Sequence, residues 1–302
     1  MTRKYRLYQI DSFTKEKFTG NPAGVITNAD GLTENEMMKI ARELNNSETA
    51  FIFSSSDPAS YDVHVRFFTP IMEVPICGHA TIAAHYARAV EQQLDTTRVI
   101  QKTGAGILPV EIIREADDYR IIMTQGKIEF GTVIEGENRE ILLAALHITE
   151  GDIMANCPIQ IVSTGHSKVM IGLKSSSVLH QLKPNYQALA QLSQRIMCNG
   201  YYTFTLNSAE DDILAKGRMF APAIGINEDP VTGNANGPLG AYLVHHKLAG
   251  QHGSFFRFKA KQGEAIERSG TIEVDVQIEN GEPLEVSVSG NAVIVFQSEL
   301  IL

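Results

Sequence analysis

The sequence has 302 residues, of which 43% are hydrophobic and 20% charged, and these proportions are typical of a globular protein, not a disordered or fibrous one. Its length exceeds what a single hydrophobic core usually supports, which predicts one large domain or two medium ones. The formal net charge of −9 disfavours nucleic acid or an anionic lipid surface as the main partner.

The cysteines and the apolar runs bear on the compartment. Cys77, Cys157 and Cys198 are odd in number and have no paired spacing, which argues against a disulfide framework and a structural zinc site. The first residues contain no apolar stretch of the kind found in signal peptides, and no run approaches 18 apolar residues. We therefore expect a cytoplasmic protein with no membrane partner.

In chain order, the first strong signal is a helix. Thr33 and Glu36 form a capping box, and apolar residues follow at the spacing of an amphipathic helix. Residues 62–67 alternate as a half-buried strand does, and residues 78–90 are small and apolar almost all round, as in a buried helix. The remaining predicted elements are strands at 107–113 and 271–278 and helices at 137–148 and 234–246.

The chain also repeats itself. Adding 152 to residues 66–70 (RFFTP) gives residues 218–222 (RMFAP), and adding 155 to residues 75–80 (PICGHA) gives residues 230–235 (PVTGNA). Looser matches flank these pairs at offsets of 145 and 159, so the offsets grow in chain order as small loop insertions would make them. We infer two homologous halves joined near residues 125–150, each a buried helix wrapped by strands.

The chemistry is expected where the repeat has diverged. The two Gly turns, at Gly78 and Gly233, each open a helix, and the unpaired N–H groups of a helix start suit a carboxylate. Glu48 has only Gly200 at the corresponding position. The turns themselves differ, because the first carries Cys77 and His79 whereas the second carries Asp229, Thr232 and Asn234. Unlike groups at equivalent places are what an acid/base site needs.

Each candidate also has a simpler interpretation. Glu48 can be a surface carboxylate and Asp229 a turn former. His79 and Asn234 can be helix N-caps, which for Asn234 is the better interpretation when it is considered alone. Cys77 can be a small buried hydrophobe. Their co-location at the repeated turns is what favours function.

Four blocks together resemble the phenazine-biosynthesis PhzF-like family, and most closely its YddE-type branch. They occur in family order and span nearly the whole chain: residues 20–25 (GNPAGV), 46–51 (NSETAF), 68–80 (FTP…PICGHA) and 228–237 (EDPVTGNANG). The resemblance implies an α+β, diaminopimelate-epimerase-like fold of two pseudo-symmetric halves, each a β-barrel-like sheet around a central helix, with the active site between them. It places the first half at 1–128 with a returning strand at about 286–302, and the second half at 129–285.

The resemblance also implies an isomerase without metal or organic cofactor, acting on a small carboxylate substrate. The family's named enzyme isomerises trans-2,3-dihydro-3-hydroxyanthranilate with one glutamate as proton shuttle. Glu48 matches that glutamate, and His79 and Asp229 match two further catalytic positions. The expected substrate-binding residues are Ser47, Gly78, Gly233, Asn234, Cys77 and Asn21. A homodimer is the expected assembly.

Two positions depart from the pattern of that enzyme. Asn234 stands where it has serine, and Cys77 stands where it has a small residue without a thiol. Related racemases place a cysteine at each of the two turns, but the second turn here has none. Three hypotheses follow: acid/base isomerisation by Glu48; a one-thiol racemase or epimerase using Cys77 with Glu48 or Asp229 as partner; or a small-acid-binding protein without turnover.

Overall fold

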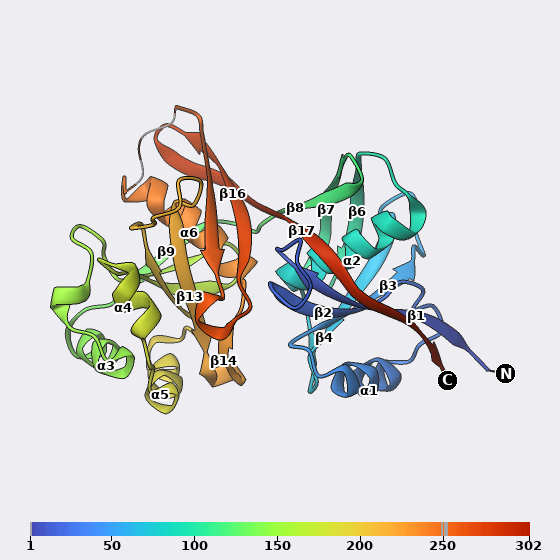
Figure 1. The fold of residues 1–302 in the computed structure, drawn as a ribbon, viewed down its shortest axis with the longest axis horizontal. Coiled ribbons are helices and arrows are strands. Elements are labelled where there is room, and N and C mark those ends of the chain that lie inside the picture. Colours follow the sequence, from blue (N-terminus) through green and yellow to red (C-terminus); the bar gives the residue numbers. More distant parts are fainter. Residues whose placement is uncertain (1, 249, 251–252) are drawn as a thin grey trace. The chain divides into compact units, whose positions relative to one another are not determined.

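The computed structural model describes residues 2–248, 250 and 253–302, which form two compact units. Unit 1 comprises Met1–Thr124 and Ser289–Leu302, and unit 2 comprises Gln125–Val288. Figure 1 shows that each unit consists of strands curving around one central helix, which is α2 in unit 1 and α6 in unit 2. Within the described residues, no helix combines the length and the hydropathy that crossing a membrane would require.

In unit 1, strands that form both parallel and antiparallel pairs surround α2 (Gly78–Gln92). Eleven residues of α2 are buried, because small side chains such as Ala80 and Ala84 let strands approach it from several directions. α1 (Glu34–Leu44) covers the outer face of the strands, starting at the Thr33 capping box that the sequence predicts. The strands are β1 (Lys4–Ser12), β2 (Asn21–Ile26), β3 (Thr49–Ser54), β4 (Val63–Phe68), β5 (Glu73–Val74), β6 (Thr97–Thr103), β7 (Gly106–Glu115) and β8 (Asp118–Thr124).

Unit 2 repeats this plan around α6 (Gly233–His245). Three helices on its outer side, α3 (Gly136–Leu146), α4 (Ser176–Gln181) and α5 (Tyr186–Ile196), contribute to a second hydrophobic cluster. The strands are β9 (Glu129–Val133), β10 (Gln160–Ser163), β11 (Ser167–Gly172), β12 (Tyr201–Thr205), β13 (Ala215–Ala221), β14 (Ile226–Asp229), β15 (Phe255–Gln262), β16 (Gly270–Glu279) and β17 (Glu282–Ile301), with short 3-10 turns at Glu150–Asp152, Pro222–Ile224 and Glu264–Ile266. The end of β17 belongs to unit 1, where it pairs antiparallel with β1.

Strand register confirms the predicted duplication. In unit 1 the parallel pair β2–β3 aligns Gly24 with Thr49, and in unit 2 the parallel pair β11–β12 aligns Val169 with Tyr201, at the offsets of 145 and 152 seen in the sequence. The antiparallel pair β3–β4 and its counterpart β12–β13 likewise keep the 152-residue offset throughout. The starts of α1 and α5 match as well, because their N-caps, Thr33 and Asn185, are also 152 residues apart.

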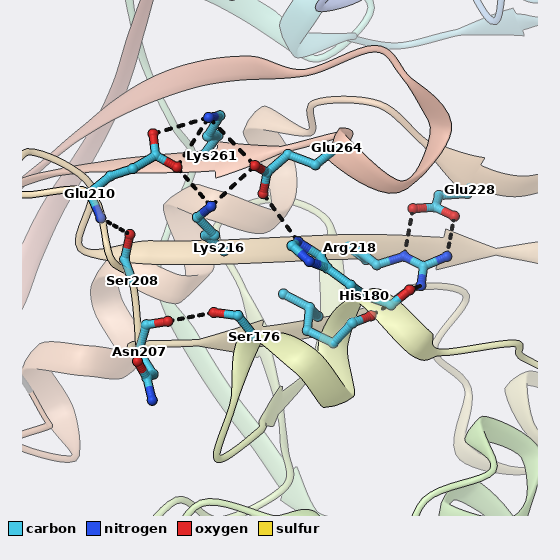
Figure 2. A network of polar contacts seen from close by, with 11 residues as sticks. Ser176, His180, Asn207, Ser208, Glu210, Lys216, Arg218, Glu228, Lys261 and Glu264 are labelled. Atoms are coloured by element: carbon cyan, nitrogen blue, oxygen red, sulfur yellow. Dashed lines mark hydrogen bonds and ion pairs between the residues drawn. The ribbon is translucent and has the colours of Figure 1, made fainter.

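The repeat extends to one ion pair in each unit. Arg66 of β4 donates two hydrogen bonds to Glu73, at 2.7 and 2.6 Å, and its guanidinium lies 5.1 Å from the ring centre of Phe68. In unit 2, Arg218 of β13 makes the equivalent bidentate contact with Glu228 (Figure 2), at 2.9 and 2.7 Å. Figure 2 also shows Lys216 of β13 and Lys261 of β15 between the carboxylates of Glu210 and Glu264. The two scaffolds therefore share packing and side-chain chemistry.

Candidate active site

Glu48 lies immediately before β3 in unit 1, and its side chain is only 15% exposed. One carboxylate oxygen is 3.4 Å from Nε2 of His79, so the simpler interpretation of Glu48 as a surface carboxylate is wrong. The short α1–β3 connection fixes this placement: Asn45 ends α1 in the left-handed conformation, and the chain then turns directly into the strand. The structure thus brings together two of the three residues predicted to be catalytic.

His79 is held from both its backbone and its ring. It is the second residue of α2 and is 6% exposed. Its carbonyl oxygen accepts a hydrogen bond of 2.8 Å from the hydroxyl of Ser12, and Ser47 Oγ lies 3.3 Å from Nε2. Asn21 is also buried and lies opposite Ser12 in the β1–β2 pair. Two of the predicted substrate-binding residues, Ser47 and Asn21, are therefore close to the imidazole or to its anchor.

Cys77 is the N-cap of α2, and its thiol faces the same imidazole. Sγ lies 3.5 Å from Nδ1 and 3.9 Å from Nε2 of His79. The donor atoms of Glu48, Cys77 and His79 all lie within 4.8 Å of one another. These ligand types and this spacing also suit a single zinc ion, although the sequence predicts no metal here. Cys77 is buried, but it is not the isolated buried hydrophobe of the simpler interpretation.

The contacts around His79 indicate which of its ring nitrogens donates a hydrogen bond and which accepts one. If Nε2 carries the hydrogen of the neutral ring, it donates toward the Glu48 carboxylate, which leaves Nδ1 as an acceptor facing the thiol of Cys77. A carboxylate on one side also stabilises the imidazolium that forms when the ring accepts a proton on the other. The cluster can therefore pass a proton between a carboxylate and a thiol through the imidazole.

The second predicted group is assembled in unit 2 around Asp229, the last residue of β14. Asp229 is 6% exposed, and its carboxylate accepts a very short hydrogen bond from the hydroxyl of Thr232. Gln262 at the end of β15 holds the turn, because its amide group donates to the Asp229 carbonyl oxygen at 2.8 Å and to Thr232 Oγ1 at 3.1 Å. Asp229 therefore does shape the turn, and its carboxylate lies at the start of α6.

The structure corrects the N-cap interpretation of His79 and Asn234. The N-cap of α2 is Cys77 and that of α6 is Thr232, both with extended backbones, so Gly78 and Gly233 are the first helical residues. His79 and Asn234 follow as second residues and do not cap. The amides of Gly233 and Asn234 belong to the first turn of α6, where a helix has no acceptor of its own for its N–H groups.

Sequence analysis did not identify Gln262, which lies 33 residues after Asp229 in the chain. It is fully buried and also accepts hydrogen bonds from the Thr232 amide and from Asn236. The sequence offered one sign of Gln262, because this amide ends a strand whose other inward-facing residues are apolar. Which groups the amide bonds is set by the tertiary fold alone.

The fold and these residues define a class of isomerases in which two homologous halves carry unlike polar groups at equivalent helix starts. The sequence pattern of the family described as phenazine biosynthesis-like protein (PhzC-PhzF) matches residues 10–298. The chain belongs to this family, and its diaminopimelate-epimerase-like α+β fold is confirmed by a solved PhzF-family structure from Bacillus anthracis. That structure has a TM-score of 0.89 and 31% identity, covering 99% of this chain and 100% of the other.

Curated relatives support the same placement. An uncharacterized isomerase of Clostridium acetobutylicum is 72% identical over the full length of both chains. The uncharacterized isomerase YddE of Escherichia coli is 49% identical, and trans-2,3-dihydro-3-hydroxyanthranilate isomerase of Pseudomonas chlororaphis is 31% identical, with 97–98% of each chain covered. The predicted resemblance to the YddE-type branch is confirmed, and the protein is an isomerase.

Proposed function

We propose that the protein isomerises a small carboxylate-bearing amino or hydroxy acid by acid/base catalysis without a cofactor, and that Glu48 is the proton shuttle. The observation that carries this proposal is the position of the Glu48 carboxylate, mostly buried and 3.4 Å from His79 Nε2. A buried carboxylate beside an imidazole can remove a proton from carbon and return it at a second position.

The other predicted residues have supporting roles. Asp229 and His79 hold the amine or hydroxyl of the substrate, and the first-turn N–H groups of α2 and α6, at Gly78 and Gly233, bind its carboxylate and stabilise developing enolate charge. That the groups of the two units act on one substrate molecule is part of this proposal. It is supported by the unlike chemistry of the two equivalent turns.

The test is Glu48→Gln, which preserves size and removes the base. Purified protein is incubated in deuterated water with trans-2,3-dihydro-3-hydroxyanthranilate, the compound in the name of the Pseudomonas relative, and with a panel of small amino and hydroxy acids. For any compound that exchanges, we expect the variant to lose about 10²–10⁴-fold in the rate of deuterium incorporation, read by mass spectrometry.

Glu43→Gln is the matched control, because Glu43 is an exposed carboxylate on the neighbouring helix α1. Its exchange rate should equal that of the wild type. Unchanged exchange in the Glu48 variant rejects Glu48 as the base. Carboxylate binding without exchange for any compound supports the small-acid-binding alternative.

A second candidate function rests on Cys77. Its Sγ lies 3.5 Å from Nδ1 of His79, so the imidazole can accept the thiol proton and leave a thiolate as a base. A one-thiol racemase would use this thiolate on one face of the substrate and Glu48 as its partner. Cys77→Ser, or alkylation of Cys77 by iodoacetamide verified by mass spectrometry, tests it: full activity after either change excludes this mechanism.

A further inference from the structure

The counterpart of Glu48 in unit 2 is Gly200, and the space above this glycine is filled. Both residues directly precede equivalent strands, β3 and β12. A Cβ placed on Gly200 would lie 2.2 Å from Cδ, 2.8 Å from Cε and 3.4 Å from Nζ of Lys168. Real Cβ atoms do not approach this closely, so the lysine side chain occupies the volume that a side chain at position 200 would need.

Strand register explains how Lys168 reaches this place. Lys168 is the second residue of β11, and the next residue, Val169, aligns with Tyr201 and donates a hydrogen bond of 2.8 Å to the Gly200 carbonyl oxygen. The lysine stem therefore passes directly over Gly200. In unit 1 the residue at the position equivalent to Gly200 is Glu48, so one unit has a carboxylate residue where the other has a lysine stem lying over a glycine.

The ammonium group of Lys168 is poorly compensated. Among the described residues, its one hydrogen bond runs to the Ser167 carbonyl oxygen at 3.2 Å, although an ammonium group has three donors. Burial lowers the pKa of Lys168, while the nearby Cys198 thiol and Asp229 carboxylate act in the opposite direction without offsetting it. A partly buried cation with donors that the described residues leave unused favours an incoming anion.

We infer that Lys168 is a substrate-binding residue that holds the carboxylate of a small amino or hydroxy acid beside the start of α6. The inference rests on the proposed function for the identity of the ligand as substrate. Two features select this class. The Lys168 ammonium and the first-turn N–H groups of α6 attract a carboxylate. The Asp229 carboxylate, close enough to interact with Lys168, instead attracts an amine or hydroxyl next to that carboxylate.

The test compares binding of charged and neutral probes by isothermal titration calorimetry. The carboxylates are benzoate, 2-aminobenzoate and 3-hydroxybutyrate, and each has its primary amide, uncharged near neutral pH, as the neutral probe. Lys168→Met keeps the length of the stem and removes the charge. We expect it to weaken binding of the carboxylates about 10-fold or more and to leave binding of the amides unchanged.

Two further variants sharpen the result. Gly200→Ala should weaken carboxylate binding similarly, because its Cβ displaces the Lys168 stem. Lys183→Met removes an exposed lysine of the same unit and should bind like the wild type. Equal loss of carboxylate and amide binding in Lys168→Met would show a structural role only and overturn the inference.

A measurement on the wild-type protein avoids any folding defect of the variants. The ¹³Cε resonance of Lys168, assigned by its disappearance in Lys168→Arg, reports the pKa of this ammonium group. Saturation with the tightest carboxylate should raise that pKa, because the bound anion stabilises the charged form. An unchanged pKa, or no binding by any carboxylate in the panel, overturns the inference. Carboxylate binding that depends on Lys168 without deuterium exchange would instead reject only the proposed catalysis.

Discussion

The two units keep the same scaffold but differ at the start of the central helix. Arg66 with Glu73 in unit 1 and Arg218 with Glu228 in unit 2 make the same bidentate pair, and each guanidinium lies 5.1 Å from a phenylalanine ring. At the helix starts the side chains differ: Cys77 and His79 in α2 stand where α6 has Thr232 and Asn234. Packing constrains the strands of a duplicated fold, whereas the proposed acid/base chemistry requires unlike groups at the helix starts.

The same contrast appears inside the central helices. His85 in α2 is fully buried, and Nε2 lies 3.0 Å from Oε1 of Gln101. The equivalent residue of α6 is Gly240, where an added Cβ would lie 2.8 Å from Val274 and Val276. Unit 2 thus packs its strand β16 directly on the helix backbone, whereas unit 1 fills that space with a polar side chain. The two copies therefore fill the same position differently, with a buried polar side chain in unit 1 and with valines of β16 packed on the helix backbone in unit 2.

Breaking the ion pairs should give the largest difference in stability. The Arg218 and Glu228 side chains are 7% and 6% exposed, against 22% and 36% for Arg66 and Glu73. Arg218→Met leaves a buried carboxylate unpaired, which typically costs about 3–5 kcal/mol of the free energy of unfolding. Arg66→Met should cost only about 0.2–1 kcal/mol, because water compensates the exposed Glu73.

Amide hydrogen exchange of β13 and β4, measured by mass spectrometry, reports the loss of stability in unit 2 and in unit 1 separately. The surrounding contacts strengthen the expectation, since Arg218 also donates to the carbonyl oxygens of Leu179 and Leu182, at 3.1 and 2.9 Å. Equal losses of protection in the two variants would contradict the idea that burial, and not the pair itself, distinguishes the units.

The buried His85 should make the stability of unit 1 depend on pH. Burial lowers its pKa from 6.5 to about 4. Below pH 6.5 the unfolded chain takes up a proton that the folded unit accepts only near pH 4, so stability falls as the pH falls through this window. The full loss is about 3 kcal/mol. Urea unfolding of wild type and His85→Gln between pH 7 and 4 measures it, and the variant should lose this part of the pH dependence.

Gly240 gives the corresponding control in unit 2, which has no titratable group at this position of its helix. Local exchange of α6 should therefore change less than that of α2 over the same pH range. A parallel loss of protection in both helices would mean that groups other than His85 dominate the acid sensitivity.

Much of the fold follows from local patterns. The capping box at Thr33 and Glu36 marks the start of α1, and the small apolar residues from 78 onward predict a central buried helix. The offsets of the repeat even predict which strands share a register, because equivalent residues of a duplicated sheet keep equivalent partners. The N-caps lie two residues earlier than the N-cap interpretation of His79 and Asn234 places them, since the backbone turns at Cys77 and Thr232.

The site is harder to predict from local sequence patterns than the fold is. Glu48 and His79 could be predicted through the repeat and the family blocks, but the contact between them is a property of the folded unit. Lys168 was not among the predicted residues. The only sequence feature that pointed to this place was Gly200, at the position equivalent to Glu48. A glycine in the sequence tells nothing about which side chain crosses over it, and here that side chain comes from the neighbouring strand.

The smallest expected effect is on stability at Asn234. Because Thr232 is the N-cap of α6, Asn234→Ala removes no capping hydrogen bond. The free energy of unfolding should change by no more than about 0.5 kcal/mol, whereas loss of a true N-cap typically costs about 1 kcal/mol. Thr232→Ala is the contrasting variant: its side chain makes no capping hydrogen bond either, but its hydroxyl donates to the buried Asp229 carboxylate, so its loss should cost about 1–3 kcal/mol.

Asn234 nevertheless occupies the predicted substrate-binding position in the first turn of α6. If it contacts the ligand, Asn234→Ala should weaken binding of the small carboxylates while leaving urea unfolding unchanged, so that the two measurements diverge. A loss of about 1 kcal/mol or more in the free energy of unfolding of Asn234→Ala would restore the capping role. Unchanged binding together with unchanged stability would remove Asn234 from the site and leave Asp229 and the helix amides as the polar groups at this turn.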